Sequence, residues 1–144
     1  MEAYTCPDEF FECDGSVEVS PGVTIGQQDR KAFGLAYQTQ VKNDTNANGY
    51  KIHLVYGAKA APSERAYTTV NDSPDAITMS WEMTTTPVAV TGHKATALLT
   101  INSLKCDKAK LAQLEGILYG SETEEPRLPL PDEVITIIGA AVEG

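Results

Sequence analysis

Apolar and polar residues alternate most clearly in two segments, 33–41 and 50–60. In FGLAYQTQV (33–41) the odd-numbered residues fall on one face of an extended strand. In YKIHLVYGAKA (50–60), Tyr50, Ile52, Leu54 and Tyr56 alternate with Lys51, His53 and Val55. The stretch between them, NDTNANG (43–49), has the composition of a turn. We therefore predict a long antiparallel β-hairpin whose buried face comprises Phe33, Leu35, Tyr37, Ile52, Leu54 and Tyr56, with Gln38 and Gln40 on the other face.

Shorter alternating runs predict the remaining strands. The first fifteen residues indicate an extended lead-in that ends in a turn at Asp14-Gly15, and SVEVSPGVTI (16–25) is divided by the turn pair Pro21-Gly22. NDSPD (71–75) is a further turn before AITMSWEMTTTPVAV (76–90), and TALLTINS (96–103) is one more strand. Trp81 shares a strand face with apolar neighbours, which is typical of a core residue and less so of a platform that stacks on a ligand. Those neighbours are Ile77, Met79 and Met83.

The period of the pattern changes from two to that of a helix in residues 107–119. Leucine and isoleucine recur at helical spacing, at Leu111, Leu114, Ile117 and Leu118. Asp107 is suited to the N-cap and Gly120 to the position after the helix. We therefore expect one domain over residues 1–144, of mostly β (α+β) class, with antiparallel strands and one flanking α-helix.

A proline-rich arm follows, within EEPRLPLPDEV (124–134). Pro126, Pro129 and Pro131 exclude a helix interior and a central strand, so residues 126–131 should be stiff and extended. We expect its apolar contacts to be made by Leu128 and Leu130, with Asp132 capping the turn after Pro131. The candidate subunit-interface residues are Leu128, Pro129, Leu130, Pro131 and Asp132. The alternative is that the arm is a strap on its own domain.

The charge of the chain limits its partners. Twenty acidic residues against eleven basic ones give a formal net charge of −9. This excess argues against gripping nucleic acid or binding an anionic membrane, although it is also what solubility alone would require. No apolar run approaches the roughly 18 residues of a membrane span, and no signal segment opens the chain. The sequence therefore predicts a globular protein without a membrane partner.

Catalytic and metal-binding motifs are not apparent. His53 and His93 do not stand near a cysteine or a carboxylate at the spacing of metal ligands. Cys6, Cys13 and Cys106 are irregularly spaced and odd in number, which is typical of reduced thiols. Adjacent acidic pairs point apart on an extended chain, so they do not make a general acid–base pair. We expect no enzyme activity, no cofactor, and no catalytic, cofactor-binding or metal-binding residues.

Three longer stretches of the chain are specific: RKAFGLAYQT, NDSPDAITMSWEMTTTPV and ILYG…RLPLPDEV. With them, nearly the whole chain resembles the major tail proteins of siphoviruses and related prophages of Gram-positive bacteria. None of these stretches is a catalytic motif. The family members carry a segment ahead of the part that matches Glu2-Ala3-Tyr4, so the resemblance implies that an N-terminal segment is lacking here.

The resemblance implies a β-sandwich of tail-tube type and a structural role in the virion. The subunit would be made in the bacterial cytoplasm, and its partners would be copies of itself in stacked hexameric rings and other tail proteins. The genome would pass through the lumen without specific binding. Six copies would carry a formal charge of about −54, which would repel DNA phosphates from the wall. Two alternatives remain: a capsid decoration or tail-tip binding module of β-sandwich type, and a small hydrolase that uses carboxylates.

Overall fold

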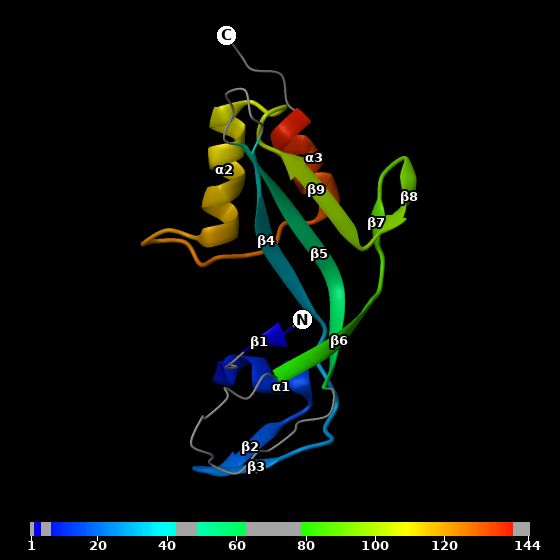
Figure 1. The fold of residues 1–144 in the computed structure, drawn as a ribbon, viewed down its shortest axis with the longest axis vertical. Coiled ribbons are helices and arrows are strands. Elements are labelled where there is room, and N and C mark those ends of the chain that lie inside the picture. Colours follow the sequence, from blue (N-terminus) through cyan, green and yellow to red (C-terminus); the bar gives the residue numbers. More distant parts are fainter. Residues whose placement is uncertain (1, 4–6, 43–48, 63–78, 140–144) are drawn as a thin grey trace. The chain divides into compact units, whose positions relative to one another are not determined.

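The computed structural model describes residues 2–3, 7–42, 49–62 and 79–139 (Figure 1). The predicted turn at 71–75, the predicted turn at 43–49 except Gly49, Ile77 of a predicted strand, and Cys6 lie outside the described residues. Strands make up 44% of the structure and helices 25%, and the sheets are antiparallel, which confirms a mostly β, α+β class. Contacts group the chain into two compact units. A single domain over 1–144 stays a prediction.

Unit 1 comprises residues 1–33 and 58–85. Its strands are β1 (Glu2–Ala3), the hairpin β2 (Val17–Ser20) and β3 (Val23–Ile25), and β6 (Met79–Thr85), which pairs with β1 and with Ala58–Pro62 of β5. The buried side chains include Ala58, Ala60 and Trp81. Trp81 is 3% exposed, so its assignment to the core is confirmed.

Aromatic contacts organise the core of unit 1. The Phe10 ring meets Phe33 and Trp81 edge to face, with centroids 5.3 and 5.5 Å apart. The indole Nε1 of Trp81 donates a hydrogen bond to Asp14 Oδ1 at 3.1 Å. The predicted extended lead-in is wrong for residues 8–14, which form the 3₁₀ helix η1 (Asp8–Phe10) and the short helix α1 (Phe11–Asp14). Acidic residues in the first turn suit a helix, and Gly15 then reverses the chain at φ +82°.

Unit 2 comprises residues 34–57 and 86–144. In its sheet, β5 (Gly49–Pro62) is hydrogen-bonded to β4 (Phe33–Val41) on one side and to β9 (Leu98–Asn102) on the other. The hairpin β7 (Val88–Val90) and β8 (His93–Thr96) is separate. The register aligns Ile52 with Ile101 and Leu54 with Leu99. These pairs lie on the face that the helices of unit 2 cover (Figure 1).

Helix α2 (Lys108–Tyr119) has the predicted limits and the predicted buried face. The Asp107 side chain accepts hydrogen bonds from the amides of Ala109 and Lys110 at 2.9 and 3.2 Å, and Gly120 ends the helix at φ +74°. Leu111, Leu114 and Leu118 are buried, as expected. They form one hydrophobic core with the inner face of the sheet and Val134; its members there are Ile52, Leu54, Tyr56 and Ile101.

A second long helix, α3 (Pro131–Gly139), was not predicted. The expectation of one flanking helix is therefore wrong. Pro131 occupies the first position of the helix, where its fixed φ is favourable and its missing amide costs no hydrogen bond. Val134 is buried in the core, and Ile137 and Ile138 pack against it. The prolines that exclude a helix interior thus permit a helix to begin at the last of them.

Strand β4 presents its faces the opposite way from the prediction, whereas β5 is as predicted. The Tyr37 ring stacks on His53 with centroids 4.7 Å apart, and His53 points away from the face of the buried Ile52 and Leu54. Tyr37 is 44% exposed. The even-numbered residues face the helices instead: Gln38 Nε2 donates to the Tyr119 hydroxyl at 2.9 Å.

The close approach of the proline arm explains this choice of face. A Cβ atom at Gly34 would lie 2.2 Å from Cδ2 of Leu128, so a larger residue there would force that leucine to move. The small residues of β4, rather than its apolar ones, therefore face the arm.

Candidate interaction surfaces

The proline arm, residues 126–131, folds back on unit 2 of its own chain. Pro129 and Pro131 are fully buried, and Leu128 is half-buried against the core. Leu130 is 62% exposed. Leu128, Pro129 and Pro131 thus make the contacts of the arm within the unit, whereas the apolar contact expected of Leu130 stays a prediction. Among these candidate interface residues, Leu130 presents the apolar side chain that is still free to meet a partner.

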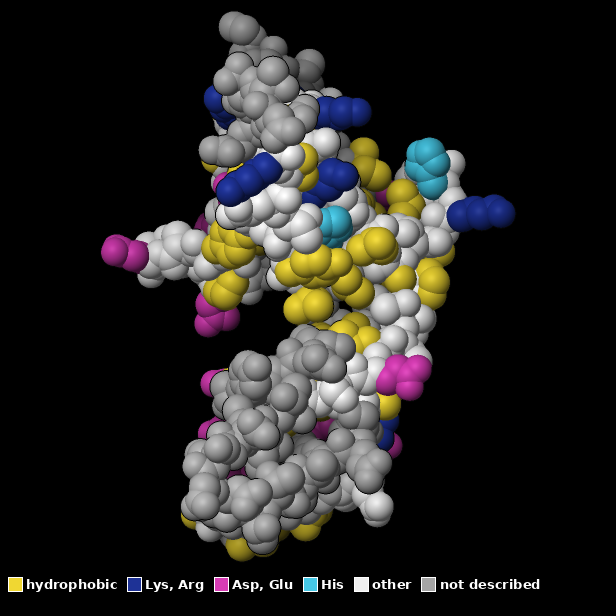
Figure 2. Space-filling view, viewed as in Figure 1, with side chains coloured by type: hydrophobic (Ala, Val, Ile, Leu, Met, Phe, Trp, Pro, Cys, Tyr) yellow, Lys and Arg dark blue, Asp and Glu magenta, His cyan; other side chains and the backbone are white. Residues whose placement is uncertain are grey.

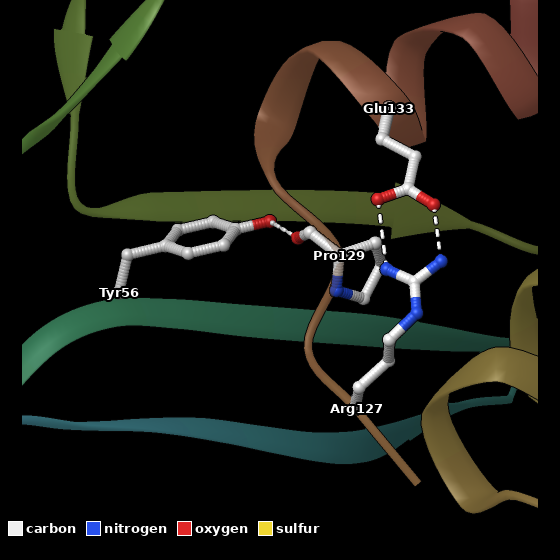
Figure 3. Close-up of polar contacts among 4 residues, drawn as sticks. All are labelled: Tyr56, Arg127, Pro129 and Glu133. Atoms are coloured by element: carbon white, nitrogen blue, oxygen red, sulfur yellow. Dashed lines mark hydrogen bonds and ion pairs between the residues drawn. The ribbon is translucent and has the colours of Figure 1, made fainter. Parts of the chain in front are cut away.

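Polar contacts fix the arm (Figure 3). The Tyr56 hydroxyl donates to the carbonyl oxygen of Pro129 at 2.9 Å. Two nitrogens of the Arg127 guanidinium donate to the two oxygens of the Glu133 carboxylate, at 2.9 and 2.5 Å. This pairing raises the pKa of Arg127 and lowers the pKa of Glu133. The Arg127 amide also donates to the Ile117 carbonyl at 3.0 Å. An ion pair this exposed contributes little to stability, so the buried prolines and the Tyr56 hydroxyl are the main anchors.

Asp132 has a different partner from the one expected. Its carboxylate accepts hydrogen bonds from the amide and the hydroxyl of Thr91, at 2.9 and 2.7 Å, and these bonds lower the pKa of Asp132. Thr91 lies in the turn between β7 and β8. Instead of capping a turn of its own segment, Asp132 therefore ties α3 to that hairpin. The sequence offers no signal for this contact, because the two residues are 41 positions apart.

Tyr56 links the stability of the arm to alkaline pH. Burial, and to a smaller extent the charge of Glu133, raise its pKa from 10.0 to about 12. A raised pKa in the folded state means that the neutral phenol stabilises the fold. This contribution is complete below pH 10 and is lost as the pH rises from about 10 to 12.

Replacing Tyr56 by phenylalanine is expected to lower the free energy of unfolding at pH 8 by about 1–3 kcal/mol, because the Pro129 carbonyl loses its donor. Between pH 10 and 12 the variant should lose less further stability than the wild type, as its residue 56 does not ionise. Urea titrations at several pH values measure both effects. Tyr37→Phe, at an exposed tyrosine, should keep the wild-type alkaline profile; an identical profile for Tyr56→Phe would contradict the assignment.

The outer face of the β4–β5–β9 sheet is a second surface, opposite the helices. Figure 2 shows apolar side chains gathered over these strands. Tyr37 and Leu98 are 44% and 54% exposed, and Leu35, Val41 and Val55 are half-buried. Both ring nitrogens of His53 lie within hydrogen-bond distance of threonine hydroxyls, those of Thr39 and Thr100. The histidine is therefore already engaged, and the face is suited to packing rather than to chemistry.

The free edge of this sheet is formed by β4. Among the described strands, β4 is at the end of the order and is hydrogen-bonded to β5 alone. Its sequence, FGLAYQTQV, contains neither a charged residue nor a proline. Natural sheets usually protect an edge with such residues, because unpaired amides and carbonyls pair readily with another strand. Sequence reasoning missed this edge, although the uncharged run of nine residues was its signal.

Cysteine, histidine and acidic side chains do not gather into a metal site in the part of the chain that the structure describes. Cys13 and Cys106 are free, half-buried thiols, and burial is the main cause that raises the pKa of Cys13. His93 is exposed on β8. Within the same described residues, none of the helices has the length and apolar character needed to cross a membrane.

Comparison with family models, with curated proteins and with solved structures finds no match to this chain.

Proposed function

We propose that this protein is a structural virion protein, a subunit of a siphovirus-type tail tube that assembles with copies of itself. In this proposal the subunit has a β-sandwich of tail-tube type, forms hexameric rings, and the rings stack into the conduit for the genome. It would be made in the host cytoplasm and reside in the virion tail, in contact with other tail proteins. The sequence resemblance in RKAFGLAYQT and RLPLPDEV supports this assignment.

The observation that carries the proposal is the unprotected edge of β4 beside an apolar outer face. A second strand added to this edge would satisfy the unpaired backbone groups of β4, as in other cases of strand addition. The side chains of the added strand would extend the outer face, so that Tyr37 and Leu98 would lie within a wider sheet. An unprotected edge is a liability for a monomer, because it can pair with other chains, whereas a subunit of a closed ring loses it on assembly.

The distribution of charge supports a conduit. Unit 1 carries 11 of the 20 acidic residues but only 4 of the 11 basic ones, so most of the negative charge belongs to one part of the chain. A lumen lined by such a part would repel phosphates over about 8–10 Å at physiological ionic strength. DNA would then pass without being held.

Negative-stain microscopy and sedimentation velocity of the purified protein test the proposal. Rings or tubes are expected, with a mass that is a multiple of the 15.5 kDa chain. Isolated monomers or trimers at all concentrations would overturn the tube assignment. They would favour the alternative of a capsid decoration or tail-tip binding module.

A charged edge should block assembly. Replacing Tyr37 and Thr39 together by lysine is expected to abolish rings and tubes, because two desolvated charges would oppose a strand added to β4. The monomer should lose no more than about 1.5 kcal/mol of stability, mainly the stacking of Tyr37 on His53 and the hydrogen bond between Thr39 and His53. Sedimentation velocity and thermal unfolding measure the two effects.

A matched control places two lysines on the hairpin of unit 1. Val19 and Val23 are 56% and 52% exposed, so the variant Val19→Lys/Val23→Lys has the same added charge on another exposed hairpin. It should assemble as the wild type does. Normal rings from the Tyr37→Lys/Thr39→Lys variant would mean that β4 is not the contact between subunits.

A further inference from the structure

Five lysines gather at one end of unit 2, at the end of the sheet where α2 begins. Lys51 of β5 is aligned with Asn102 of β9, and the Lys105 amide donates to the Asn102 carbonyl at 3.0 Å. Lys42 follows β4 and lines the same hollow as Gly49 and Tyr50. This surface, here called the lysine end, comprises Lys42, Lys51, Lys105, Lys108 and Lys110. Figure 2 shows basic side chains gathered in this part of unit 2.

The lysine end also has an apolar element. Leu104 is 50% exposed there, and its side chain packs directly over the backbone of Gly49, where a Cβ atom would lie 2.5 Å from Leu104 Cγ. Among the described residues near these lysines, two are acidic. The Asp107 carboxylate accepts from the amides that it caps, and the Glu115 carboxylate accepts from the Tyr50 hydroxyl at 2.6 Å. Five lysines against these two carboxylates leave this end of unit 2 with an excess of positive charge.

An acidic loop lies at the other end of α2. Residues 121–125 are exposed and carry three carboxylates, Glu122, Glu124 and Glu125. The loop is an ordered turn, since the Ser121 amide donates to the Glu124 carbonyl at 2.9 Å and Ser121 Oγ accepts from the Glu124 amide at 3.1 Å. Arg127, which follows, forms its ion pair with Glu133. Figure 2 shows acidic side chains at the tip of this projecting loop.

The two surfaces are too far apart to neutralise each other within one chain. Helix α2 separates them with its 12 residues, a length of about 18 Å. This exceeds the screening length of about 8–10 Å at physiological salt. They are, however, complementary in charge, and they lie at opposite ends of the same helix. Such a pair of unlike surfaces fits a head-to-tail contact between copies, which generates rings or open stacks.

We infer that the acidic loop of one subunit binds the lysine end of the next. This inference rests on the proposed self-assembly and specifies one of its contacts. A second copy is favoured over nucleic acid as the partner because the same chain supplies a matching acidic loop and carries a net charge of −9, which repels phosphates. Contacts of this kind contribute to the rate and the specificity of association more than to its strength, and they weaken as salt increases.

Charge reversal on each surface tests the contact. The variants are E122K/E124K/E125K, which reverses the loop, and K105E/K108E/K110E, which reverses the lysine end. Each variant alone is expected to associate at least tenfold more weakly than the wild type in sedimentation experiments at 50 mM salt. An equimolar mixture of the two should regain association, because the reversed loop then meets the reversed lysine end. Wild-type association should weaken between 50 and 500 mM salt.

The matched control reverses three exposed acidic residues of unit 1, in the variant E9K/D29K/E82K, and should associate as the wild type does. If the loop and lysine-end variants form normal rings, the inferred contact is wrong while the tail-tube function stands. If the wild type itself never associates, both are wrong. A lysine-end variant that assembles normally but loses binding to a 30-base-pair duplex would also overturn the inference, in favour of a nucleic-acid contact.

Discussion

Replacing Leu114 by alanine is expected to lower the free energy of unfolding by about 2–5 kcal/mol. The Leu114 side chain is 0% exposed and packs in the core between α2 and the inner face of the sheet, with Ile52 and Leu54. Its removal leaves a cavity that rigid neighbours on both sides cannot fill. Urea denaturation followed by circular dichroism measures the loss.

Leu130→Ala is the matched control, because the same atoms are removed from a side chain that is 62% exposed. This change should alter the stability by no more than about 0.5 kcal/mol. A loss below that value for Leu114→Ala would mean that α2 does not pack on the sheet.

Replacing Gly57 by valine is expected to cost about 2–4 kcal/mol. Gly57 has φ +58°, a conformation that costs an L-residue about 1–2 kcal/mol and is worse for a β-branched one. A Cβ atom there would lie 2.4 Å from the carbonyl oxygen of Thr86, whose amide donates to the Gly57 carbonyl at 3.0 Å. The contact is with backbone, so a side-chain rotation cannot relieve it. Denaturant unfolding measures the cost.

Gly116→Ala provides the comparison for this variant. Gly116 lies inside α2, and a Cβ atom there would have open space around it. Alanine should stabilise the protein by about 0.4–1 kcal/mol, since it restricts the unfolded chain and favours the helix. If Gly57→Val is as stable as the wild type, the fold does not require the left-handed conformation of residue 57 within β5.

The residues that hold unit 2 together differ from those proposed to join subunits. Pro129, Pro131 and the Tyr56 hydroxyl anchor the arm inside the unit. Tyr37, on the other hand, is exposed on the outer face. Variants on the edge or at the charged ends should therefore change assembly with small effects on unfolding, and core variants should do the reverse. This separation makes the functional proposals testable in a folded protein.

Elements whose form depends on neighbours along the chain could be predicted from the sequence. The limits of α2 follow from the Asp107 cap, the leucine spacing and Gly120, all within one segment. The buried face of β5 follows from the strong contrast between Ile52 or Leu54 and the polar Lys51 and His53 beside them. The candidate interface was only partly predictable: the arm was expected, but not which of its side chains would be buried.

Tertiary contacts decided the remainder. The alternation in β4 has little contrast, since Gly34 and Ala36 are as compatible with burial as Leu35. The face that β4 turns toward the arm is the one where Gly34 meets Leu128, nearly a hundred residues away in sequence. The arm lies with Pro129 and Pro131 buried, and the hydroxyl that holds it there, that of Tyr56, is 73 positions away from Pro129. Asp132 accepts a hydrogen bond from Thr91, 41 positions away, instead of capping its own turn. Local pattern determines which segments are helices and strands, but which face is buried depends on the shape of the surface that packs against it.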